Sequence, residues 1–522
     1  MELNSQISQW IWNSKYRFFG ADGNAIDSSI EDTWRRIAET VASVEKEPKK
    51  WDQKFYDALK EFKFLPAGRI IAGAGTGRSV TLFNCFVMGD IPDDMAGIFT
   101  AVKEAALTLQ QGGGIGYNFS TLRPKGASVV GVGADASGPL SFMDVWDSMC
   151  RTIMSAGSRR GAMMATLRCD HPDIEDFVEA KKDPSRLRMF NLSVLITDKF
   201  MEAVSGGKNW DLKFEGRVYK TIAATELWNK IMKSTYEFAE PGVIFIDRIN
   251  KQNNLAYCEK ISATNPCGEQ PLPAYGACLL GSINLAKLIN KPFEKCASMD
   301  LMALRELTGT AVRMLDNVID ISRYPIDQQR EEAVSKRRIG LGITGLADAL
   351  IMCGVRYGSK EAVNLTKNWL RVLRDSAYRC SIDLAKEKGS FPLFVKEKFI
   401  ENHNVKKLSK DLRAGIYSYG IRNALLTSIA PTGTISLLAN NVSSGLEPVF
   451  AFKYNRKVLQ SDGSSFIEPV SDYALALFEK LKGKGENKPQ AFVDAQTLQP
   501  NDHLVMQAAV QELSLIHISE PT

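Results

Sequence analysis

The stretch of this chain best suited to chemistry is NPCGE, in which Cys267 stands between Asn265 and Glu269. A thiol can react with a substrate that an amide holds by hydrogen bonds, while a carboxylate acts on the same substrate as a general acid or base. Pro266 and Gly268 argue against a helix. In an extended backbone, side chains two apart face the same side, at roughly 6.5–7 Å from one another. We therefore expect the three side chains to line one face at a spacing that suits a ribose-sized substrate.

Other interpretations of Cys267 stay open at this point. A buried structural cysteine in a turn is the usual fate of this residue type. A nucleophilic cysteine, as in a thiol hydrolase, needs a histidine base, and of the four histidines only His171, in a CDHPD turn, precedes the motif. A second thiol, Cys278, follows eleven positions after Cys267, yet the nine cysteines of the chain include no C-x-x-C pair.

Length and composition exclude several classes of protein. The chain has 522 residues and a net charge of +5 without a basic, aromatic-rich run, so we expect small anionic ligands and no direct nucleic-acid binding. It lacks the eighteen or so consecutive apolar residues of a membrane span and a recognisable signal peptide. Nine unpatterned cysteines then indicate a reduced, cytoplasmic protein. No histidine lies at metal-ligand spacing from a cysteine, so no metal site is expected.

The elements that must position these residues follow from hydrophobic periodicity. Residues 28–63 predict two amphipathic helices separated by Pro48. Beyond them, apolar β-rich runs alternate with helical patterns, which predicts one α/β architecture with a largely parallel sheet, open or closed into a barrel. The expected strands are 80–88, 163–170, 192–198, 242–249 and 423–430, and the expected helices are 95–111, 139–156, 301–322 and 360–389.

Three glycine-rich stretches were weighed as ligand-binding loops. GLGITG (340–345) matches a dinucleotide fingerprint but follows a polar, helical segment, so we interpret it as a turn before a helix. GGGIG (112–116) could approach a ligand or only turn the chain. APTGTISLLA (430–439) follows an expected strand and offers hydroxyls and backbone N–H groups that can hold phosphates, although an ordinary capped turn would look the same.

Taken together, the motifs resemble the catalytic subunit of ribonucleotide reductases, most closely the adenosylcobalamin-dependent (class II) type. NPCGE followed by GACLLGSINL carries the resemblance, and further segments match in the family's order from about residue 64 to 450. These are FNCFVM, GGGIGYNFSTLRPKGA, SGPLSFMDVWD, AGSRRGA, DHPDI, RRIGLGITGLADAL and APTGTIS.

The resemblance implies a ten-stranded α/β barrel over residues 64–513, after an N-terminal helical segment at 1–63, with Cys267 on a loop inside the barrel. We find no counterpart of the barrel's closing strands or of the family's C-terminal cysteine pair. The family's S-P-T segment near the substrate is replaced here by PAGRI (66–70), so no substrate contact is assigned from it. Residues 514–522 (SLIHISEPT) continue no upstream pattern. We expect them to be a non-native tail on an incomplete barrel, with a frayed natural terminus as the alternative.

The resemblance also implies a mechanism, the reduction of ribonucleotides to 2′-deoxyribonucleotides. Cys267 matches the cysteine that becomes a thiyl radical and takes the 3′ hydrogen, Glu269 matches the base and Asn265 the amide that holds the 3′ hydroxyl. Cys85 and Cys278 match the pair of thiols that supplies two electrons and closes to a disulfide.

Binding residues are carried over in the same way. The substrate contacts are Asn84 and Gly114, with a phosphate-binding turn at Pro431, Thr432, Gly433, Thr434 and Ile435. The site for a deoxynucleotide effector is matched by Asp93, Arg123, Ser158, Arg159 and Arg160, since arginine pairs well with phosphate oxygens.

The implied cofactor is adenosylcobalamin, and the implied reductant is a protein of the thioredoxin or glutaredoxin type. A homodimer is one oligomeric state that the resemblance allows. Two alternatives remain. A class I large subunit would use a metal-carrying radical partner, but Cys85 comes too early for that class's usual regulatory preface. A non-catalytic nucleotide-binding protein would not need the complete set of cysteines and carboxylate.

Overall fold

The structure is a computed structural model that describes residues 3, 5–129, 133–153, 161–459 and 464–513. The described residues form two compact units. Unit 1 is drawn from Met1–Asn84, Leu279–Arg323 and Ala333–His517, and unit 2 from Cys85–Cys278 and Tyr324–Glu332. Each unit is described by itself below.

The N-terminal helices of unit 1 begin where their capping residues predict. After a short helix, α1 (Gln6–Ile11), come α2 (Ile30–Ala42) and α3 (Pro48–Leu59). Ser29 and Asp32 form a reciprocal capping box at the start of α2. Proline is the first residue of α3, where its missing N–H costs nothing. The two helices predicted in 28–63 are therefore confirmed.

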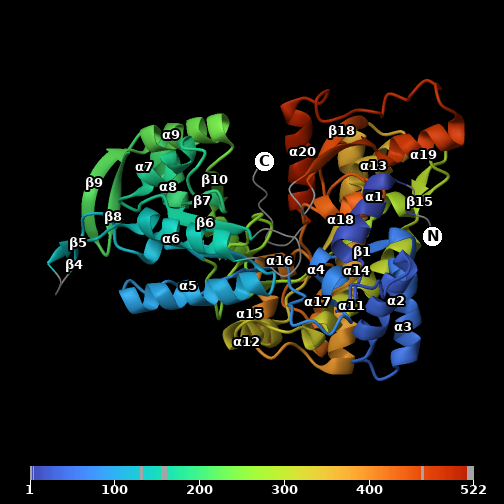
Figure 1. Cartoon of the computed structure of the whole chain (residues 1–522), viewed down its shortest axis with the longest axis horizontal. Helices are drawn as coiled ribbons and strands as arrows, with labels where there is room; N and C mark the ends of the chain where they lie inside the picture. The colour runs from blue at the N-terminus through green and yellow to red at the C-terminus, as the bar shows by residue number, and fades with distance from the viewer. Residues whose placement is uncertain (1–2, 4, 130–132, 154–160, 460–463, 514–522) are drawn as a thin grey trace. The chain divides into compact units, whose positions relative to one another are not determined.

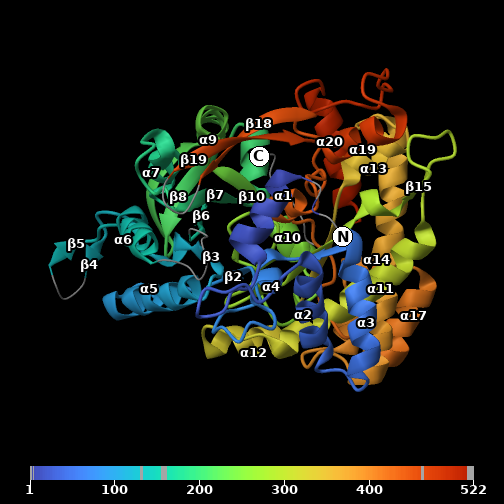
Figure 2. The same ribbon diagram turned by 45° about the vertical axis from the view of Figure 1, so that its right-hand side comes forward.

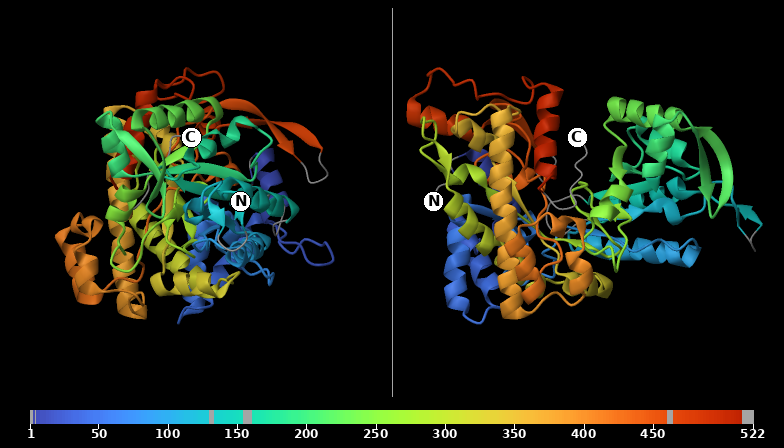
Figure 3. Two further views of the ribbon diagram at one scale, coloured as in Figure 1. Left: turned by 90° about the vertical axis from the view of Figure 1, so that its left-hand side faces the viewer. Right: turned by 180° about the vertical axis from the view of Figure 1, so that it is seen from behind.

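A three-stranded sheet and two long helices make up much of the rest of unit 1. The strand order is β1 (Phe64–Pro66), β14 (Leu280–Asn284) and β17 (Gly340–Thr344), with β14 parallel to β17. Helices α11 (Leu301–Ile321) and α14 (Lys360–Lys388) pack along each other and α14 also contacts α17 (Lys410–Tyr419), as Figure 2 shows; Figure 3 gives the view from behind. Both long helices match their predicted ranges closely.

Two expectations in unit 1 are wrong. GLGITG is not a turn but the fully buried strand β17, with only Gly345, at φ +71°, turning the chain into helix α13 (Leu346–Met352). The stretch 423–430 is not a regular strand: it runs beside β17 with one bridge, Leu341 to Thr427. Gly342 allows the two segments to lie this close, because a Cβ there would lie 2.3 Å from the Ser428 carbonyl oxygen. This glycine of the motif therefore serves the approach of another backbone segment.

Unit 2 is built on a six-stranded sheet. Its strand order is β10 (Gly242–Phe245), β7 (Phe190–Ile196), β6 (Met163–Arg168), β3 (Gly114–Asn118), β2 (Cys85–Val87) and β13 (Ala277–Cys278). All neighbours are parallel except β13, which pairs antiparallel with β2. Parallel neighbours need helical crossovers, and the expected α/β class with a largely parallel sheet is confirmed.

Helices connect the parallel strands of unit 2. Helix α5 (Met95–Gln110) is capped by Asp94, whose carboxylate accepts a bond from Gly97 N. It lies beside α6 (Pro139–Thr152), while α7 (Ile174–Glu179), α8 (Asp198–Ser205) and α9 (Ala224–Phe238) gather near the hairpin of β8 (Asn209–Phe214) and β9 (Arg217–Ala223) (Figure 1).

Some predicted strands of unit 2 are too long. The expected strand 80–88 is regular only at Cys85–Val87, and the one at 242–249 ends at Phe245, where α10 (Ile246–Gln252) begins. In the part of the chain that the structure describes, no helix combines the length and apolarity needed to cross a membrane.

Candidate active site

The NPCGE motif forms a tight turn, so the expectation of an extended backbone is wrong. Strand β11 (Ala263–Thr264) pairs antiparallel with β12 (Pro271–Leu272), and residues 265–270 connect them. Gly268 N donates to the Asn265 carbonyl at 3.0 Å. Proline in the second position of such a turn presets its φ angle, and Gly268 takes φ +81°, which suits glycine. The three side chains therefore do not alternate along a strand.

The turn separates the three motif side chains by burial. Asn265 and Glu269 are buried, whereas Cys267 is exposed at the tip. Asn265 Oδ1 accepts a bond from Gln270 N at 2.9 Å, which closes the base of the loop. Its Nδ2 is buried and has no acceptor among the residues that the structure describes. A buried donor of this kind is costly unless something satisfies it, so Asn265 holds an N–H ready for a ligand oxygen.

Two glycines of β3 allow the loop to lie on the sheet. A Cβ at Gly116 would lie 1.9 Å from the Thr264 carbonyl oxygen, and one at Gly114 would lie 3.0 Å from Pro266 Cγ and 3.1 Å from Cys85 Sγ. Any larger side chain would push the segment away. GGGIG therefore serves close approach, and Gly114 lies between the Cys267 turn and Cys85.

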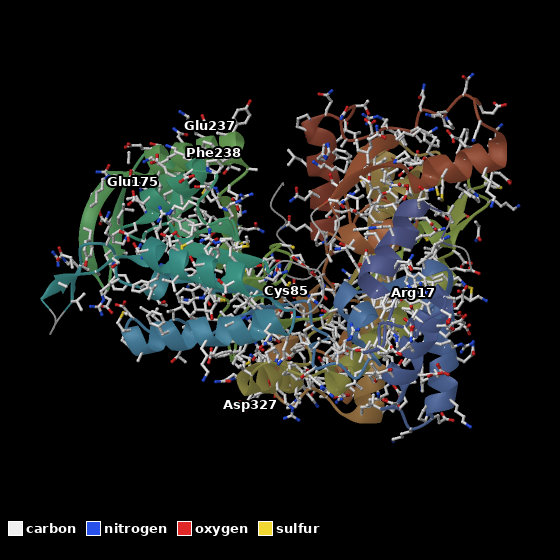
Figure 4. All side chains as sticks on the ribbon, viewed as in Figure 1. Arg17, Cys85, Glu175, Glu237, Phe238 and Asp327 are labelled. Atoms are coloured by element: carbon white, nitrogen blue, oxygen red, sulfur yellow. The ribbon has the colours of Figure 1, made fainter. Side chains whose placement is uncertain are left out.

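Cys85 and Cys278 are brought together across a strand pair. They are directly opposite each other in the antiparallel register of β2 and β13, and Figure 4 labels Cys85 on its strand. Opposite residues of such a pair have Cα atoms about 4.5–5.5 Å apart, which lies inside the range that a disulfide spans. Asn84, the last residue of unit 1, precedes Cys85, and its buried Oδ1 has no donor among the described residues.

The predicted phosphate turn lies in unit 1 at the start of α18 (Gly433–Leu438). Thr432 adopts φ +50°, which is rare for a β-branched residue. A Cβ at Gly433 would meet nothing within 4 Å, so the backbone there faces open space. Gly433 and Thr434 line a cavity of about 450 Å³. A larger cavity of unit 1, about 1370 Å³ along α3, α11 and α14, contains none of the predicted site residues.

The predicted effector residues that the structure describes also meet. Arg123 Nε donates to Asp93 Oδ2 at 2.7 Å, and its second terminal nitrogen donates to the Asp93 carbonyl at 2.9 Å. Both side chains are partly exposed. Ser158, Arg159 and Arg160 lie outside the described residues.

His171 has a structural role that the sequence did not reveal. Its Nδ1 accepts a bond from Asp173 N at 3.1 Å, so Nε2 carries the proton and donates to the Leu122 carbonyl at 3.0 Å. Burial is the main cause that lowers the pKa of His171. Both ring nitrogens are thus engaged in hydrogen bonds to the backbone, in a segment next to Arg123. This histidine is therefore not available as the base that a thiol hydrolase would need.

Sequence reasoning missed residues that support the site from a distance. Asn191, on β7, donates from Nδ2 to the Pro266 carbonyl at 2.7 Å and so holds the Cys267 turn. Its separation of 75 positions from Pro266 left no local signal. Gly116 was visible within GGGIG, but only the crossing of Thr264 shows why it must be glycine.

Comparisons with known proteins agree with this arrangement. The family model for the ribonucleotide reductase barrel domain matches residues 83–516, and that for the ribonucleotide reductase all-alpha domain matches residues 2–79. The chain therefore belongs to the ribonucleotide reductase large-subunit family.

Individual relatives are similar over most of this chain. It is 38% identical to a vitamin B12-dependent ribonucleoside-diphosphate reductase of Mycobacterium tuberculosis, over 96% of this chain and 72% of that protein. It is 34% identical to a protein of the same name from Thermoplasma acidophilum, over 93% and 63%. Identity to the ribonucleoside-diphosphate reductase subunit alpha of Chlamydia muridarum is 28%, over 91% and 50%.

Proposed function

We propose that this protein reduces ribonucleotides to 2′-deoxyribonucleotides through a thiyl radical on Cys267, with adenosylcobalamin as cofactor. The observation that carries the proposal is the register of β2 and β13, which sets Cys85 opposite Cys278, on the sheet over which the Cys267 turn crosses. Two cysteines whose backbones pair within the range that a disulfide spans, beside a third cysteine at the tip of a turn, are what a two-electron reduction started by a radical requires.

Each group of the NPCGE turn has a distinct task. Cys267, exposed at the tip of the turn, takes the 3′ hydrogen from the ribose, which makes the 2′ hydroxyl a better leaving group, and returns this hydrogen to the 3′ carbon at the end of the turnover, when the 3′ oxygen also regains its proton. The carboxylate of the buried Glu269 removes the proton of the 3′ hydroxyl. The Nδ2 group of Asn265 donates a hydrogen bond to the same hydroxyl oxygen and so fixes the sugar in place.

The cysteine pair balances the reaction. The 2′ C–O bond breaks and the oxygen leaves as water, while a C–H bond forms at the same carbon. Two electrons and two protons are needed, and the thiols of Cys85 and Cys278 supply them as their sulfurs join in a disulfide. An external dithiol of the thioredoxin or glutaredoxin type must then reduce this disulfide for the next turnover.

The exposed Cys267 thiol is open to a radical source, as the proposed cofactor requires. When bound, adenosylcobalamin supplies an organic radical that can abstract a hydrogen atom. This chain's contribution is to hold the thiol at the tip of a closed loop, through the Asn265–Gln270 bonds and the Asn191–Pro266 bond. Identity to the relatives named vitamin B12-dependent is higher than identity to the relative named ribonucleoside-diphosphate reductase subunit alpha, which also favours this cofactor.

The remaining predicted residues take the parts that the family resemblance gives them. The substrate phosphates bind the turn at residues 431–435, and Asn84 and Gly114 contact the nucleotide. A deoxynucleotide effector binds at Asp93, Arg123 and residues 158–160. The domain limits 1–63, 64–513 and 514–522, closure of the strands into a ten-stranded barrel, a homodimer and a cytoplasmic location belong to the same proposal.

A single-turnover assay distinguishes the candidate functions. The reduced protein is mixed with a ribonucleoside diphosphate or triphosphate, with or without adenosylcobalamin, and both deoxynucleotide and the Cys85–Cys278 disulfide are quantified. We expect one disulfide per deoxynucleotide, only with the cofactor. Product that instead requires a metal-carrying partner protein would support the class I alternative, and nucleotide binding without product would support a non-catalytic nucleotide-binding protein.

A further inference from the structure

We propose that Thr344, at the end of β17, is a positioning residue that holds the phosphate turn in its binding conformation. The inference rests on the proposed function of residues 431–435. It concerns a residue that lies 88 positions before Thr432 in the sequence and is fully buried.

Three hydroxyl groups meet beneath the turn. Thr344 Oγ1 lies 3.1 Å from Thr432 Oγ1 and 2.8 Å from Ser436 Oγ, and the last two lie 3.0 Å apart. All three side chains are buried. Buried hydroxyls contribute stability only when each donor finds an acceptor, so the proton positions can be worked out.

The proton of Thr344 has one destination. Its hydroxyl donates to the Ser443 carbonyl at 2.8 Å, because a carbonyl cannot donate in return. Thr344 Oγ1 can therefore only accept from Thr432 and Ser436. Thr432 Oγ1 in turn accepts from Gly445 N at 2.8 Å. Every hydroxyl of the cluster can then be satisfied, with Thr344 as an acceptor within reach of both other hydroxyls, which also lie within bonding distance of each other.

The cluster acts on the strained residue of the turn. Thr432 has φ +50°, and the left-handed region costs a non-glycine residue about 1–2 kcal/mol. Side-chain bonds to Thr344 and Gly445 hold it there, and Ser436 N donates to the Thr432 carbonyl at 2.8 Å. The direction of the peptide groups that follow Thr432, at Gly433 and Thr434, therefore depends on the Thr344 hydroxyl.

Thr344 is itself anchored to a rigid base. Its strand β17 is fully buried, and Gly345 N donates to the Ser443 carbonyl at 2.7 Å, beside the Thr344 bond. Ser443 N donates to Asp348 Oδ2 at 2.7 Å. The strand and the Ser443 loop thus form a fixed frame from which Thr344 reaches the turn.

The test replaces the hydroxyl by a methyl group of the same size, Thr344→Val. We expect the KM for a ribonucleoside diphosphate to rise roughly tenfold, with a much smaller change in kcat. The reason is that the hydrogen bonds made by the Thr344 hydroxyl, which contribute about 1–1.5 kcal/mol, are lost. Affinity for the matching ribonucleoside, which lacks phosphates, should not change. Thr344→Ser keeps the hydroxyl and should restore the KM. The matched control is Thr366→Val, which removes another buried threonine hydroxyl of unit 1.

The outcomes separate this inference from the proposed function. If the unmodified protein neither binds nor reduces ribonucleoside diphosphates, the proposed function fails. If it does both, while Thr344→Val has the KM of Thr366→Val, or loses nucleoside and nucleotide affinity alike, the positioning role is overturned. Should Thr344→Val not fold, Ser436→Ala replaces it, because it removes a second hydroxyl of the cluster. We then expect a KM increase of about threefold, and an unchanged KM would overturn the role equally.

Discussion

Cys85 and Cys278 lie opposite each other across the only antiparallel step of the unit 2 sheet that the described strands form. Their separation of 193 positions in the sequence makes the pair invisible to any local pattern such as C-x-x-C. Because opposite residues in an antiparallel pair have Cα atoms within the range that a disulfide spans, a disulfide between them needs no rearrangement of the backbone.

We therefore predict that mild oxidation with diamide joins Cys85 to Cys278 in preference to other pairs. Peptide mapping by mass spectrometry without reduction should detect this linkage, and Cys85→Ser should remove it. Cys150→Ser is the control, because Cys150 is a buried cysteine of the same unit whose pKa is raised by burial to about 11. A dominant disulfide to a cysteine other than these two would contradict the assigned pair.

Replacing Cys267 by serine should abolish nucleotide reduction and leave nucleotide affinity nearly intact. The O–H bond of serine is too strong for a carbon radical to break usefully, whereas the turn geometry tolerates the substitution because the side chain is exposed. Product formation and nucleotide binding should be measured in parallel. Cys296→Ser, an exposed cysteine of unit 1, is the control that keeps activity. Turnover near that control in the Cys267 variant would rule out the thiyl mechanism.

The sequence predicted the elements of the site better than their local shape. Helices such as α5 and α14 follow from amphipathic periodicity and capping residues, which are local signals. The NPCGE stretch was expected to be extended, yet Pro266 and Gly268 fold it into a turn. The same two residues that exclude a helix also favour a turn, so the local shape of this stretch is encoded by residues close together in the sequence.

What could not be predicted depends on contacts between distant segments. Position 342 has to be glycine because Ser428 passes over it, and no feature of GLGITG reveals that neighbour. Thr344 and Asn191 act on residues 88 and 75 positions away, respectively. The motifs of a family resemblance identify residues that touch substrate, whereas residues that hold those groups in place are found only from the packing.

A buried ion pair should be essential to the stability of unit 1. Asp316 on α11 is fully buried and accepts bonds from Arg337 Nε and Asn423 Nδ2, both at 2.8 Å. Asp316→Ala leaves a buried guanidinium without this partner, so we expect a loss of about 3–5 kcal/mol in the free energy of unfolding. Urea denaturation measures it.

The control for that loss is Asp383→Ala, which breaks the surface pair with Lys386 on α14. An exposed pair contributes about 0–1 kcal/mol, so its denaturation midpoint should hardly move. Equal midpoints for the two variants would show that the Asp316 pair does not stabilise the fold as its burial requires.

A second buried pair should make the stability of unit 1 depend on pH. The carboxyl groups of Asp348 and Asp472 are both buried and hydrogen-bonded to each other. Burial raises the pKa of Asp348 to about 6, and burial together with the nearby charge of Asp348 raises the pKa of Asp472 well above its usual range. The pair therefore shares at least one proton at neutral pH.

The sign of the effect follows from proton binding. The unfolded chain loses these protons near pH 4, whereas the folded chain keeps them, so stability falls as pH rises above about 4. The Asp348 contribution is lost by about pH 6, and the Asp472 contribution continues to fall at higher pH. Asp472→Asn removes the second part, since an amide can donate to Asp348 and still accept from Leu475 N, as Asp472 does at 3.0 Å.

We therefore expect Asp472→Asn to be more stable than the unmodified protein at pH 8 and to lose this advantage near pH 4. Urea denaturation at pH 4, 6 and 8 tests it. Asp383→Asn, an exposed aspartate of the same unit, should follow the unmodified protein at each pH. If the Asp472→Asn curve instead runs parallel to the unmodified one from pH 4 to 8, the two carboxyl groups do not share a proton in the folded protein.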